Sequence, residues 1–209
     1  MTFWDQQYSQ PDYKYGTTPN AFLQAQVAQL PAGGDVLVPG DGEGRNGVWL
    51  AEQGFHVTSV DSSTVGLAKS AALAAARHVA IETIAADLTE WAPTPRSLDG
   101  LVLVYVHFPP TRRPSIHRAL LAGLRVGGVV ILEAFHPSQI GRASGGPKDV
   151  SMLFTLELLR SDIADVPDAR FEEIVAWEGE TVLDEGPGHQ GAAMVTRLVA
   201  RRVESISPG

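Results

Sequence analysis

The sequence predicts an α/β fold, with a doubly wound and mostly parallel sheet. Strand-like and helix-like segments alternate between residues 35 and 135, which is typical of right-handed strand–helix–strand units. The segment 99–106 is almost continuously apolar, as expected of a parallel strand that is buried on both faces. Two further strand-like segments follow one another directly near the C-terminus, so we expect them to pair antiparallel.

Local signals place each element along the chain. Pro19-Asn20 precedes the first helix and the run Pro31–Gly34 ends it, while Gly54 ends the second helix. Ser62 or Ser63 is the candidate N-cap of the third helix. The expected strands are, in order, 35–39, 55–60, 79–85, 99–106, 129–135, 171–183 and 192–203. The expected helices are 21–30, 45–53, 62–77, 112–124 and 155–164.

The length predicts a single domain over residues 1–209. Within it we expect an aromatic arm and a helix over 1–30, a core over 35–135, and a loop, a helix and a hairpin over 136–209. The arm carries five aromatic side chains in its first twenty residues, which is unlike a solvated tail. The loop that opens the last part is long and glycine-rich, and such loops often close over a binding site.

Composition excludes several kinds of chemistry. The chain has no cysteine, which removes disulfides, a thiolate nucleophile and cysteine-bound metal, and its histidines match no metal-ligand spacing. The net charge of −8 disfavours a nucleic-acid partner, so none is expected. No apolar segment reaches the ~20 residues that span a bilayer, and the N-terminus lacks a signal-peptide pattern. We therefore expect a cytoplasmic protein without a membrane partner, whose oligomeric state the sequence does not indicate.

A glycine-rich loop follows the first strand. Gly40, Gly42 and Gly44 alternate with Asp41 and Glu43, and the glycines permit a tight turn and close approach of the backbone to a ligand. Such loops occur in dinucleotide-dependent enzymes and in S-adenosylmethionine-dependent methyltransferases. Two carboxylates would repel a pyrophosphate, whereas they suit a cationic sulfonium compound. The loop therefore favours S-adenosylmethionine as the cofactor.

Two further acids stand at strand ends. Asp61 ends the second strand, where a carboxylate typically accepts hydrogen bonds from ribose hydroxyls. Asp87 follows the third strand and is placed to accept from an adenine amino group. Glycines, a ribose acid and an adenine acid on three consecutive strand ends form a more specific pattern than the loop alone.

These motifs resemble those of class I S-adenosylmethionine-dependent methyltransferases over nearly the whole chain. The matching stretches are GDGEGRN at 40–46, VDSS at 60–63, ADL at 86–88 and LRVGG at 124–128. The opening residues Trp4-Asp5, Tyr8, Tyr15-Gly16 and Pro19-Asn20 resemble the tellurite-resistance and thiopurine-methyltransferase-like branch. Val38 stands where the family often has an acid, and Asp41 or Glu43 are the candidates to compensate for it.

The resemblance implies a seven-stranded sheet whose last strand is reversed, and a cofactor site on the strand ends. The expected cofactor-binding residues are Gly40, Asp41, Gly42, Gly44, Arg45, Asn46, Asp61, Ser62, Ser63, Ala86, Asp87, Leu88 and Tyr105. Arg45 is a candidate for binding the cofactor carboxylate or an anionic acceptor.

Three histidines are candidates for the acceptor side. His107 follows the fourth strand, where it could act as a general base or could hydrogen-bond the loop backbone. His136 follows the fifth strand and could contact the acceptor. His189 lies in the expected hairpin loop, where most histidines are simply exposed, although it could close over the site. We take His107 and His136 as the catalytic candidates.

The leading hypothesis is direct in-line transfer of a methyl group from S-adenosylmethionine to a small-molecule acceptor. An oxidoreductase that depends on a nicotinamide dinucleotide remains an alternative on the same fold, and so does a binding module that holds S-adenosylmethionine without catalysis. The identity of the acceptor does not follow from the sequence.

Overall fold

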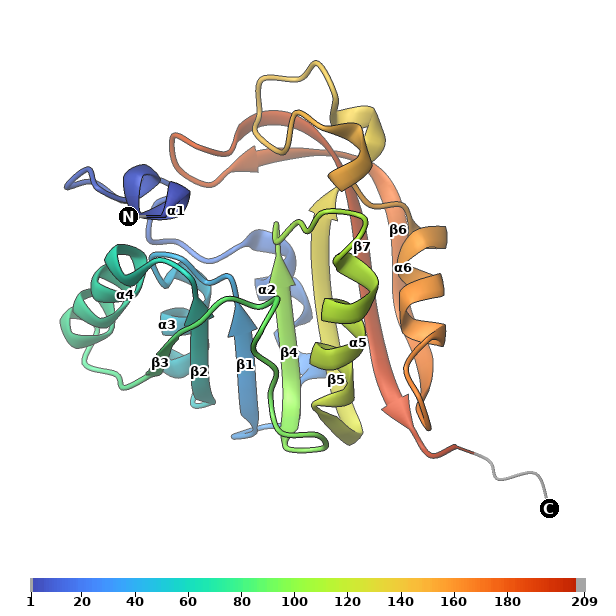
Figure 1. The fold of residues 1–209 in the computed structure, drawn as a ribbon. Helices are drawn as coiled ribbons and strands as arrows, with labels where there is room; N and C mark the ends of the chain where they lie inside the picture. The colour runs from blue at the N-terminus through green and yellow to red at the C-terminus, as the bar shows by residue number, and fades with distance from the viewer. Residues whose placement is uncertain (1, 206–209) are drawn as a thin grey trace.

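The computed structural model describes residues 2–205, which form a seven-stranded sheet flanked by helices (Figure 1). The strands are β1 (Asp35–Pro39), β2 (His56–Asp61), β3 (Glu82–Ala85), β4 (Leu98–Val104), β5 (Leu124–Phe135), β6 (Arg170–Asp184) and β7 (Gln190–Val203). The α-helices are α1 (Phe3–Gln7), α2 (Ala21–Gln26), α3 (Arg45–Glu52), α4 (Thr64–Ala76), α5 (Arg113–Ala122) and α6 (Leu156–Ala164). Short 3-10 helices occupy Val27–Gln29, Pro137–Gln139 and Val150–Met152.

The strand order across the sheet is β3-β2-β1-β4-β5-β7-β6. Neighbours from β3 to β5 pair in parallel, whereas β7 runs antiparallel to both β5 and β6. The prediction of a doubly wound, mostly parallel sheet with the last strand reversed is therefore confirmed. None of the helices within residues 2–205 is long and apolar enough to cross a membrane.

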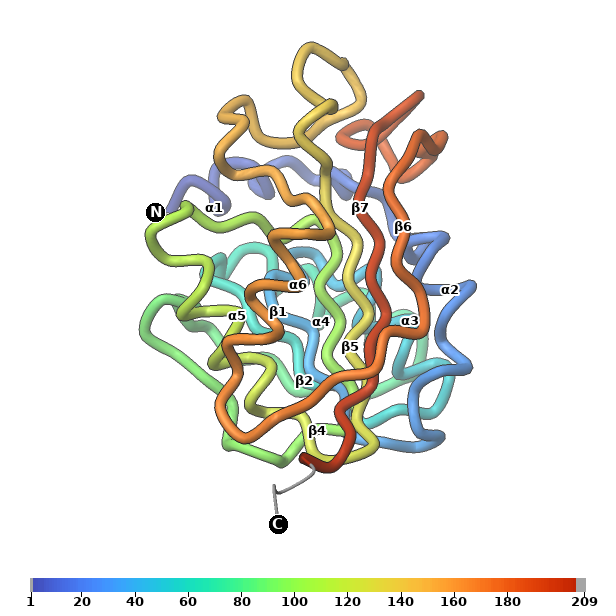
Figure 2. Tube along the Cα trace, turned by 90° about the vertical axis from the view of Figure 1, so that its right-hand side faces the viewer, coloured from blue at the N-terminus to red at the C-terminus, as the bar shows by residue number. Residues whose placement is uncertain are grey.

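Two apolar layers cover the sheet, one on each face. Leu101, Leu103 and Leu132 pack against α5 and α6 on one face. Val102 and Ile131 point to the other face, where the side chains of α2 and α3 cover them. Figure 2 shows the sheet between these two groups of helices. The alternation along β4 and β5 explains why their sequences are apolar without interruption.

The carboxyl ends of the parallel strands meet at the upper edge of the sheet in Figure 1. Three segments lie over this edge: α1 with the chain that follows it, the loop after β5, and the hairpin between β6 and β7 (Figures 1 and 2). They come from opposite ends of the sequence, so the edge is closed only when the whole chain is folded.

One observed helix was not expected, and three expected elements have clearly different bounds. Helix α1 was not predicted, because five residues carry no periodicity; it forms through a capping box in which Thr2 and Asp5 bond to each other's backbone N–H groups. The third strand begins at Glu82 rather than at residue 79, and the fifth begins at Leu124 rather than at 129. The helix expected over 21–30, which is α2, ends at Gln26, and the chain continues as a 3-10 turn over Val27–Gln29.

Glycines with left-handed backbones flank α3. Gly44 precedes the helix with φ 88°, and Gly54 follows it with φ 89°. A Cβ atom at Gly44 would lie 2.8 Å from the backbone of Ser70, whereas nothing lies within 4 Å of a Cβ atom at Gly54. Both glycines adopt the left-handed conformation, but only at Gly44 would a Cβ atom clash with a neighbouring residue.

We predict that Gly44→Ala lowers the free energy of unfolding by about 2–5 kcal/mol, since it adds a clash to the left-handed strain. Gly54→Ala should lower it by only about 1–2 kcal/mol, because it adds the strain alone. Urea unfolding of both variants and of the parent measures the difference. Equal losses in the two variants would contradict the close packing of α3 against α4.

Candidate functional site

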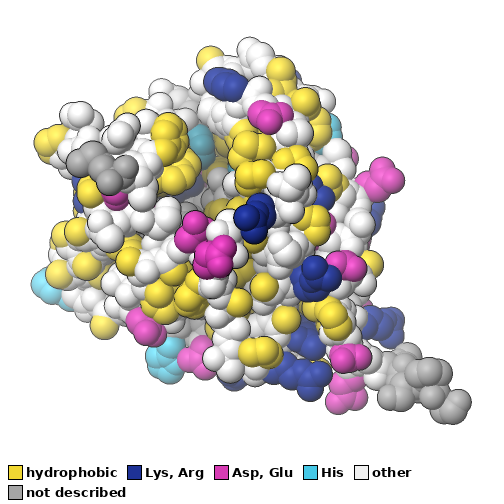
Figure 3. All heavy atoms as spheres, viewed as in Figure 1, with side chains coloured by type: hydrophobic (Ala, Val, Ile, Leu, Met, Phe, Trp, Pro, Cys, Tyr) yellow, Lys and Arg dark blue, Asp and Glu magenta, His cyan; other side chains and the backbone are white. Residues whose placement is uncertain are grey.

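A cavity of about 720 Å³ opens at the carboxyl edge of the sheet, under the three covering segments. Its volume lies within the range of about 300–1,000 Å³ that is typical of small-molecule sites. Figure 3 shows the surface hollowed between the N-terminal arm and the loop after β5. Of the thirteen expected cofactor-binding residues, those that line it are Gly40, Asp41, Arg45, Asn46, Asp61, Ser62, Ala86, Asp87, Leu88 and Tyr105.

The remaining three expected residues are packed against the protein. Gly42 and Gly44 lie where a Cβ atom would meet Tyr8 and Ser70 respectively, so these glycines are required for close packing. Ser63 is fully buried; its hydroxyl donates to Asp5 of α1 and accepts from the N–H of Gly66. These three residues shape the loop and its surroundings without facing the cavity.

The two acids of the glycine-rich loop are bonded to the protein itself. Asp41 accepts from the hydroxyl of Ser59 at 2.6 Å and from the N–H of Gly47 at 3.2 Å. Glu43 accepts from the N–H of Lys14 and from Nζ of Lys69, at 2.7 and 2.6 Å. The loop carboxylates therefore fix the loop to β2, to the N-terminal arm and to α4. Burial raises the pKa of Asp41 to about 6, against the opposing effect of its hydrogen bonds.

Asp61 ends β2 with its carboxylate at the cavity wall. Its two oxygens accept from the N–H groups of Gly42 and Ser63, at 2.9 and 2.8 Å. Burial raises its pKa above the usual value, although the backbone hydrogen bonds oppose the shift. Each oxygen retains a second lone pair, so the carboxylate can still accept from a ligand.

Asp87 lies at the outer end of the cavity beyond β3. It is exposed and accepts from the N–H of Thr89 at 2.8 Å, which lowers its pKa. Its chain neighbours Ala86 and Leu88 also line the cavity. The acids at the ends of β2 and β3 thus lie along one wall, as expected for a nucleoside.

Aromatic side chains of the N-terminal arm cover the cavity. Trp4 and Tyr8 of the first turn stack with ring centroids 5.5 Å apart, and Tyr15 reaches the opposite wall. Helix α1 is fixed by Asp5, whose carboxylate accepts from the hydroxyl of Ser63 at 2.7 Å. Lys69 binds the carbonyl oxygens of Gln10 and Asp12 and so holds the rest of the arm. Four of the five arm aromatics, Phe3, Trp4, Tyr8 and Tyr15, therefore line the cavity, whereas Tyr13 packs against a cluster formed by α3 and α4.

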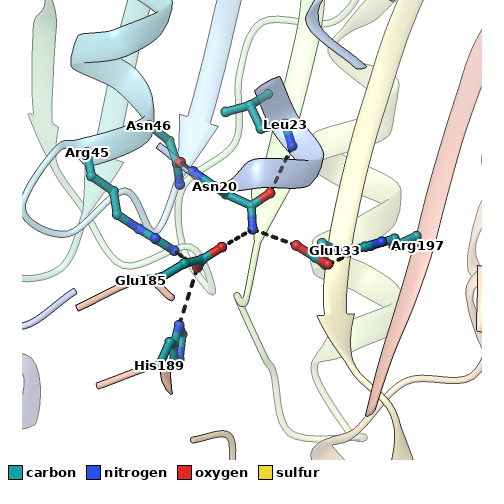
Figure 4. A network of polar contacts seen from close by, with 8 residues as sticks. All are labelled: Asn20, Leu23, Arg45, Asn46, Glu133, Glu185, His189 and Arg197. Atoms are coloured by element: carbon teal, nitrogen blue, oxygen red, sulfur yellow. Dashed lines mark hydrogen bonds and ion pairs between the residues drawn. The ribbon is translucent and has the colours of Figure 1, made fainter. Parts of the chain in front are cut away.

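A buried polar network lies behind the cavity (Figure 4). The side-chain amide of Asn20 donates to Glu133 at 2.5 Å and to Glu185 at 2.7 Å. Arg45 donates to the free oxygen of Glu185, and Arg197 to the free oxygen of Glu133, each at 2.7 Å. Two cations balance two carboxylates here, which is what keeps such charges tolerable away from water. The network joins α2, α3, β5, β7 and the β6–β7 hairpin.

Three polar atoms of this region are buried without a hydrogen-bond partner in the protein: Nη1 of Arg45, Oη of Tyr105 and Nδ1 of His189. All three residues line the cavity. Tyr105 also has a left-handed backbone with φ 56°, a strained conformation that concentrates at functional sites. Buried groups without partners are uncommon, and these three belong to residues at the cavity wall.

His107 lines the cavity, and both of its ring nitrogens contact the backbone. Nδ1 donates to the carbonyl of Met152 at 2.7 Å, and Nε2 accepts from the N–H of Phe135 at 3.3 Å. Burial, with smaller effects of neighbouring histidines, lowers its pKa to about 4. These contacts favour the backbone-bonding alternative over the general base.

His136 does not line the cavity. It caps the 3-10 helix that follows β5 by accepting from the N–H of Ser138, and its Nε2 lies 3.8 Å from Glu178. His189 instead lies in the cavity wall and is buried, contrary to the exposure expected of a loop histidine. Sequence reasoning also missed Glu185, although the DEGPGHQG loop places it four residues before His189.

Comparisons with known proteins agree with this geometry. Residues 36–128 match the model of a family described as "Methyltransferase domain". A tRNA (uracil(54)-C(5))-methyltransferase of Pyrococcus abyssi is 27% identical over 94% of this chain, which spans 44% of that protein. The chain therefore covers less than half of that relative's length.

Solved structures share the fold. An S-adenosylmethionine-dependent methyltransferase of Methanosarcina mazei superimposes with a TM-score of 0.67 at 16% identity, covering 90% of this chain and all of that one. TehB of Haemophilus influenzae gives 0.66 at 21% identity, covering 95% of this chain and 65% of that one. The similarity to a methyltransferase domain thus extends over residues 36–128, less than half of this chain, and the solved structures show that the fold is shared.

We predict that Asp41 makes the protein less stable as the pH rises. Its pKa is 3.8 when exposed and about 6 in the fold, so the folded state binds more protons between these values. The contribution lost across this window is up to about 3 kcal/mol. Asp41→Asn does not titrate, so its stability relative to the parent should rise from pH 4 to pH 7.

Urea unfolding of both proteins at the two pH values measures this change. A difference between variant and parent that stays constant from pH 4 to pH 7 would contradict the raised pKa of Asp41 in the folded state.

Proposed function

We propose that this protein transfers a methyl group from S-adenosylmethionine to a small-molecule acceptor. The observation that carries the proposal is a roofed cavity that is lined by the strand-end acids and by residues of the glycine-rich loop. The family match over residues 36–128 supports the transfer chemistry.

The cofactor would lie along the wall formed by the ends of β1, β2 and β3. Asp61 would accept from the ribose hydroxyls, and Asp87 would accept from the adenine amino group. The methionine part would then extend past Gly40 toward Arg45 and Asn46. In this arrangement the methyl group would face the part of the cavity that Tyr15 and His189 line.

A small acceptor fits this arrangement better than a polymer. The space beside the cofactor wall is enclosed by α1, by the loop after β5 and by the hairpin, and aromatic rings line it. The net charge of −8 also disfavours binding to a phosphate backbone. Methyl transfer in such a site relies on in-line positioning of the acceptor.

The tRNA-modifying relative suggests a nucleic-acid acceptor as a second candidate. The chemistry of this chain limits how a nucleic-acid acceptor could be methylated. Methylation of a pyrimidine at C5 by way of a cysteine nucleophile cannot occur here, since the chain has no cysteine. The shared fold of TehB is compatible with the tellurite-resistance branch that the opening aromatics resemble.

We predict that S-adenosylhomocysteine, the product form of the cofactor, binds saturably to the full chain. Asp61→Ala should weaken this binding about 10- to 100-fold, because it removes charge-assisted hydrogen bonds to the ribose. Isothermal titration calorimetry measures both affinities, and circular dichroism verifies that the variant is folded.

Asp35→Ala is the matched control. Like Asp61, Asp35 is an aspartate, but it lies at the start of β1, at the other end of the parallel strands. Its side chain is half exposed, and its loss should leave the affinity for S-adenosylhomocysteine unchanged. Absence of saturable binding by the folded parent would overturn the proposed function. Heat protection by a nicotinamide dinucleotide in place of S-adenosylhomocysteine would favour the oxidoreductase alternative.

A further inference from the structure

His189 and Glu185 form a pair in the β6–β7 hairpin at the inner wall of the cavity. Nδ1 of His189 lies 3.7 Å from Oε2 of Glu185, and each side chain is only 7% exposed. The hairpin backbone fixes their spacing, because the N–H of Glu185 donates to the carbonyl of His189 at 2.9 Å. The separation exceeds a normal hydrogen bond, and such contacts often shorten when a ligand fills the site.

Glu185 is itself held on two further sides. Oε1 accepts from Asn20, and Oε2 accepts from Arg45. The carboxylate therefore cannot turn away from the imidazole, and it favours the tautomer with the proton on Nδ1. That tautomer leaves the lone pair of Nε2 free, in a side chain that lines the cavity.

We infer that His189, oriented by Glu185, is the general base of the reaction, and that the acceptor is an aromatic compound with an acidic hydroxyl group, such as a phenol. This inference rests on the proposed methyl transfer. Glu185 acts through His189 and is a positioning residue.

The rings around His189 define the shape of the acceptor. Tyr15, Tyr105 and Phe135 surround the imidazole at centroid distances of 4.4, 4.6 and 5.3 Å. Aromatic walls of this kind favour a flat aromatic molecule through offset and edge-to-face contacts.

The chemistry of the base restricts the acceptor further. The O–H proton moves to Nε2 of His189 while the oxygen forms a bond to the methyl carbon and the carbon–sulfur bond breaks. The products are the methyl ether, neutral S-adenosylhomocysteine and an imidazolium ion, whose charge Glu185 stabilises until the proton passes to water. An imidazole is well matched to a phenolic hydroxyl and poorly matched to the much weaker acid of an alkyl hydroxyl.

The surroundings keep His189 neutral and able to accept a proton. Burial lowers its pKa, and the charges of Arg45 and Lys14 add to the effect, while Glu185 opposes it. The titratable and charged groups that face it are Glu185 on the hairpin, Arg45 on α3, Lys14 and Tyr15 on the arm, Tyr105 after β4, and His107 beside them. His107 is a poorer base, because the N–H of Phe135 occupies its Nε2.

Two phenols with different acidities test the base. At pH 8, 4-nitrophenol is largely ionised and needs no base, whereas 4-methoxyphenol keeps its proton. With the full chain and S-adenosylmethionine, we expect His189→Gln to reduce methylation of 4-methoxyphenol at least ~100-fold and that of 4-nitrophenol far less. His56→Gln is the matched control, since the His56 side chain is 80% exposed on the opposite edge of the sheet.

The role of Glu185 is tested through the tautomer and the pKa of the His189 ring, which would stay unchanged if Glu185 had only a structural role. Nitrogen NMR of the histidine rings should show the Nδ1-protonated tautomer for His189, identified by its absence in His189→Gln. Glu185→Gln should lower the pKa of this ring and mix its tautomers, and Glu185→Asp should restore part of the 4-methoxyphenol rate.

The outcomes separate this inference from the proposed function. Equal loss on both phenols, no loss on either, or an unchanged His189 ring in Glu185→Gln would overturn the assignment of the base. Binding of S-adenosylhomocysteine without methylation of either phenol by the parent would overturn the acceptor class. Failure to bind S-adenosylhomocysteine would instead overturn the proposed function itself.

Discussion

The double donation from Asn20 to two buried carboxylates holds the site together. Its amide reaches Glu133 on β5 and Glu185 on the hairpin, which lie 113 and 165 residues further along the chain. Each carboxylate is then neutralised by an arginine, one from α3 and one from β7. Removing one member of such a network leaves a charge buried and unpaired, which typically costs about 3–5 kcal/mol. The side chain that caps α2 thus also fixes the wall of the cavity.

The inner wall of the site is formed by strand ends and by this network, in which Asn20, Arg45 and Arg197 donate to the two carboxylates. The cover is bonded to the same frame. The hydroxyl of Ser63 donates to Asp5 of α1, and the hydroxyl of Ser144, in the loop after β5, donates to the carbonyl of Ala192 on β7. The acids that would receive a ligand are therefore held in place by the protein itself. Preorganised polar groups of this kind are what catalysis by positioning requires.

Most of the fold could be predicted because its signals are local. Apolar runs, glycine turns and N-caps placed every strand of the sheet and all helices except α1, mostly to within a few residues. The wall formed by Asp61 and Asp87 could be predicted for a related reason. Parallel strands end at the same edge of a sheet, so strand-end residues meet whatever the details of packing.

The inner wall could not be predicted in this way. His189 and Glu185 belong to a hairpin loop, and nothing in the eight residues between the last two strands shows that this loop folds inward. Its position depends on Arg45 and Asn20, which are distant in sequence. The fate of His107 likewise depends on the carbonyl of Met152, 45 residues away, and that contact is invisible in the local pattern.

The position of β7 has a consequence for synthesis of the chain. Strand β7 follows β6 in the chain but lies between β5 and β6 in the sheet, so one edge of β5 has no neighbour until β7 has been synthesised. An apolar strand with an unpaired edge is prone to pair with other chains. Arg197, the partner of Glu133, is carried by the same late strand. Completion of the sheet and neutralisation of the buried acid therefore coincide, and a nascent chain that stalls before residue 190 would be exposed to aggregation and proteolysis.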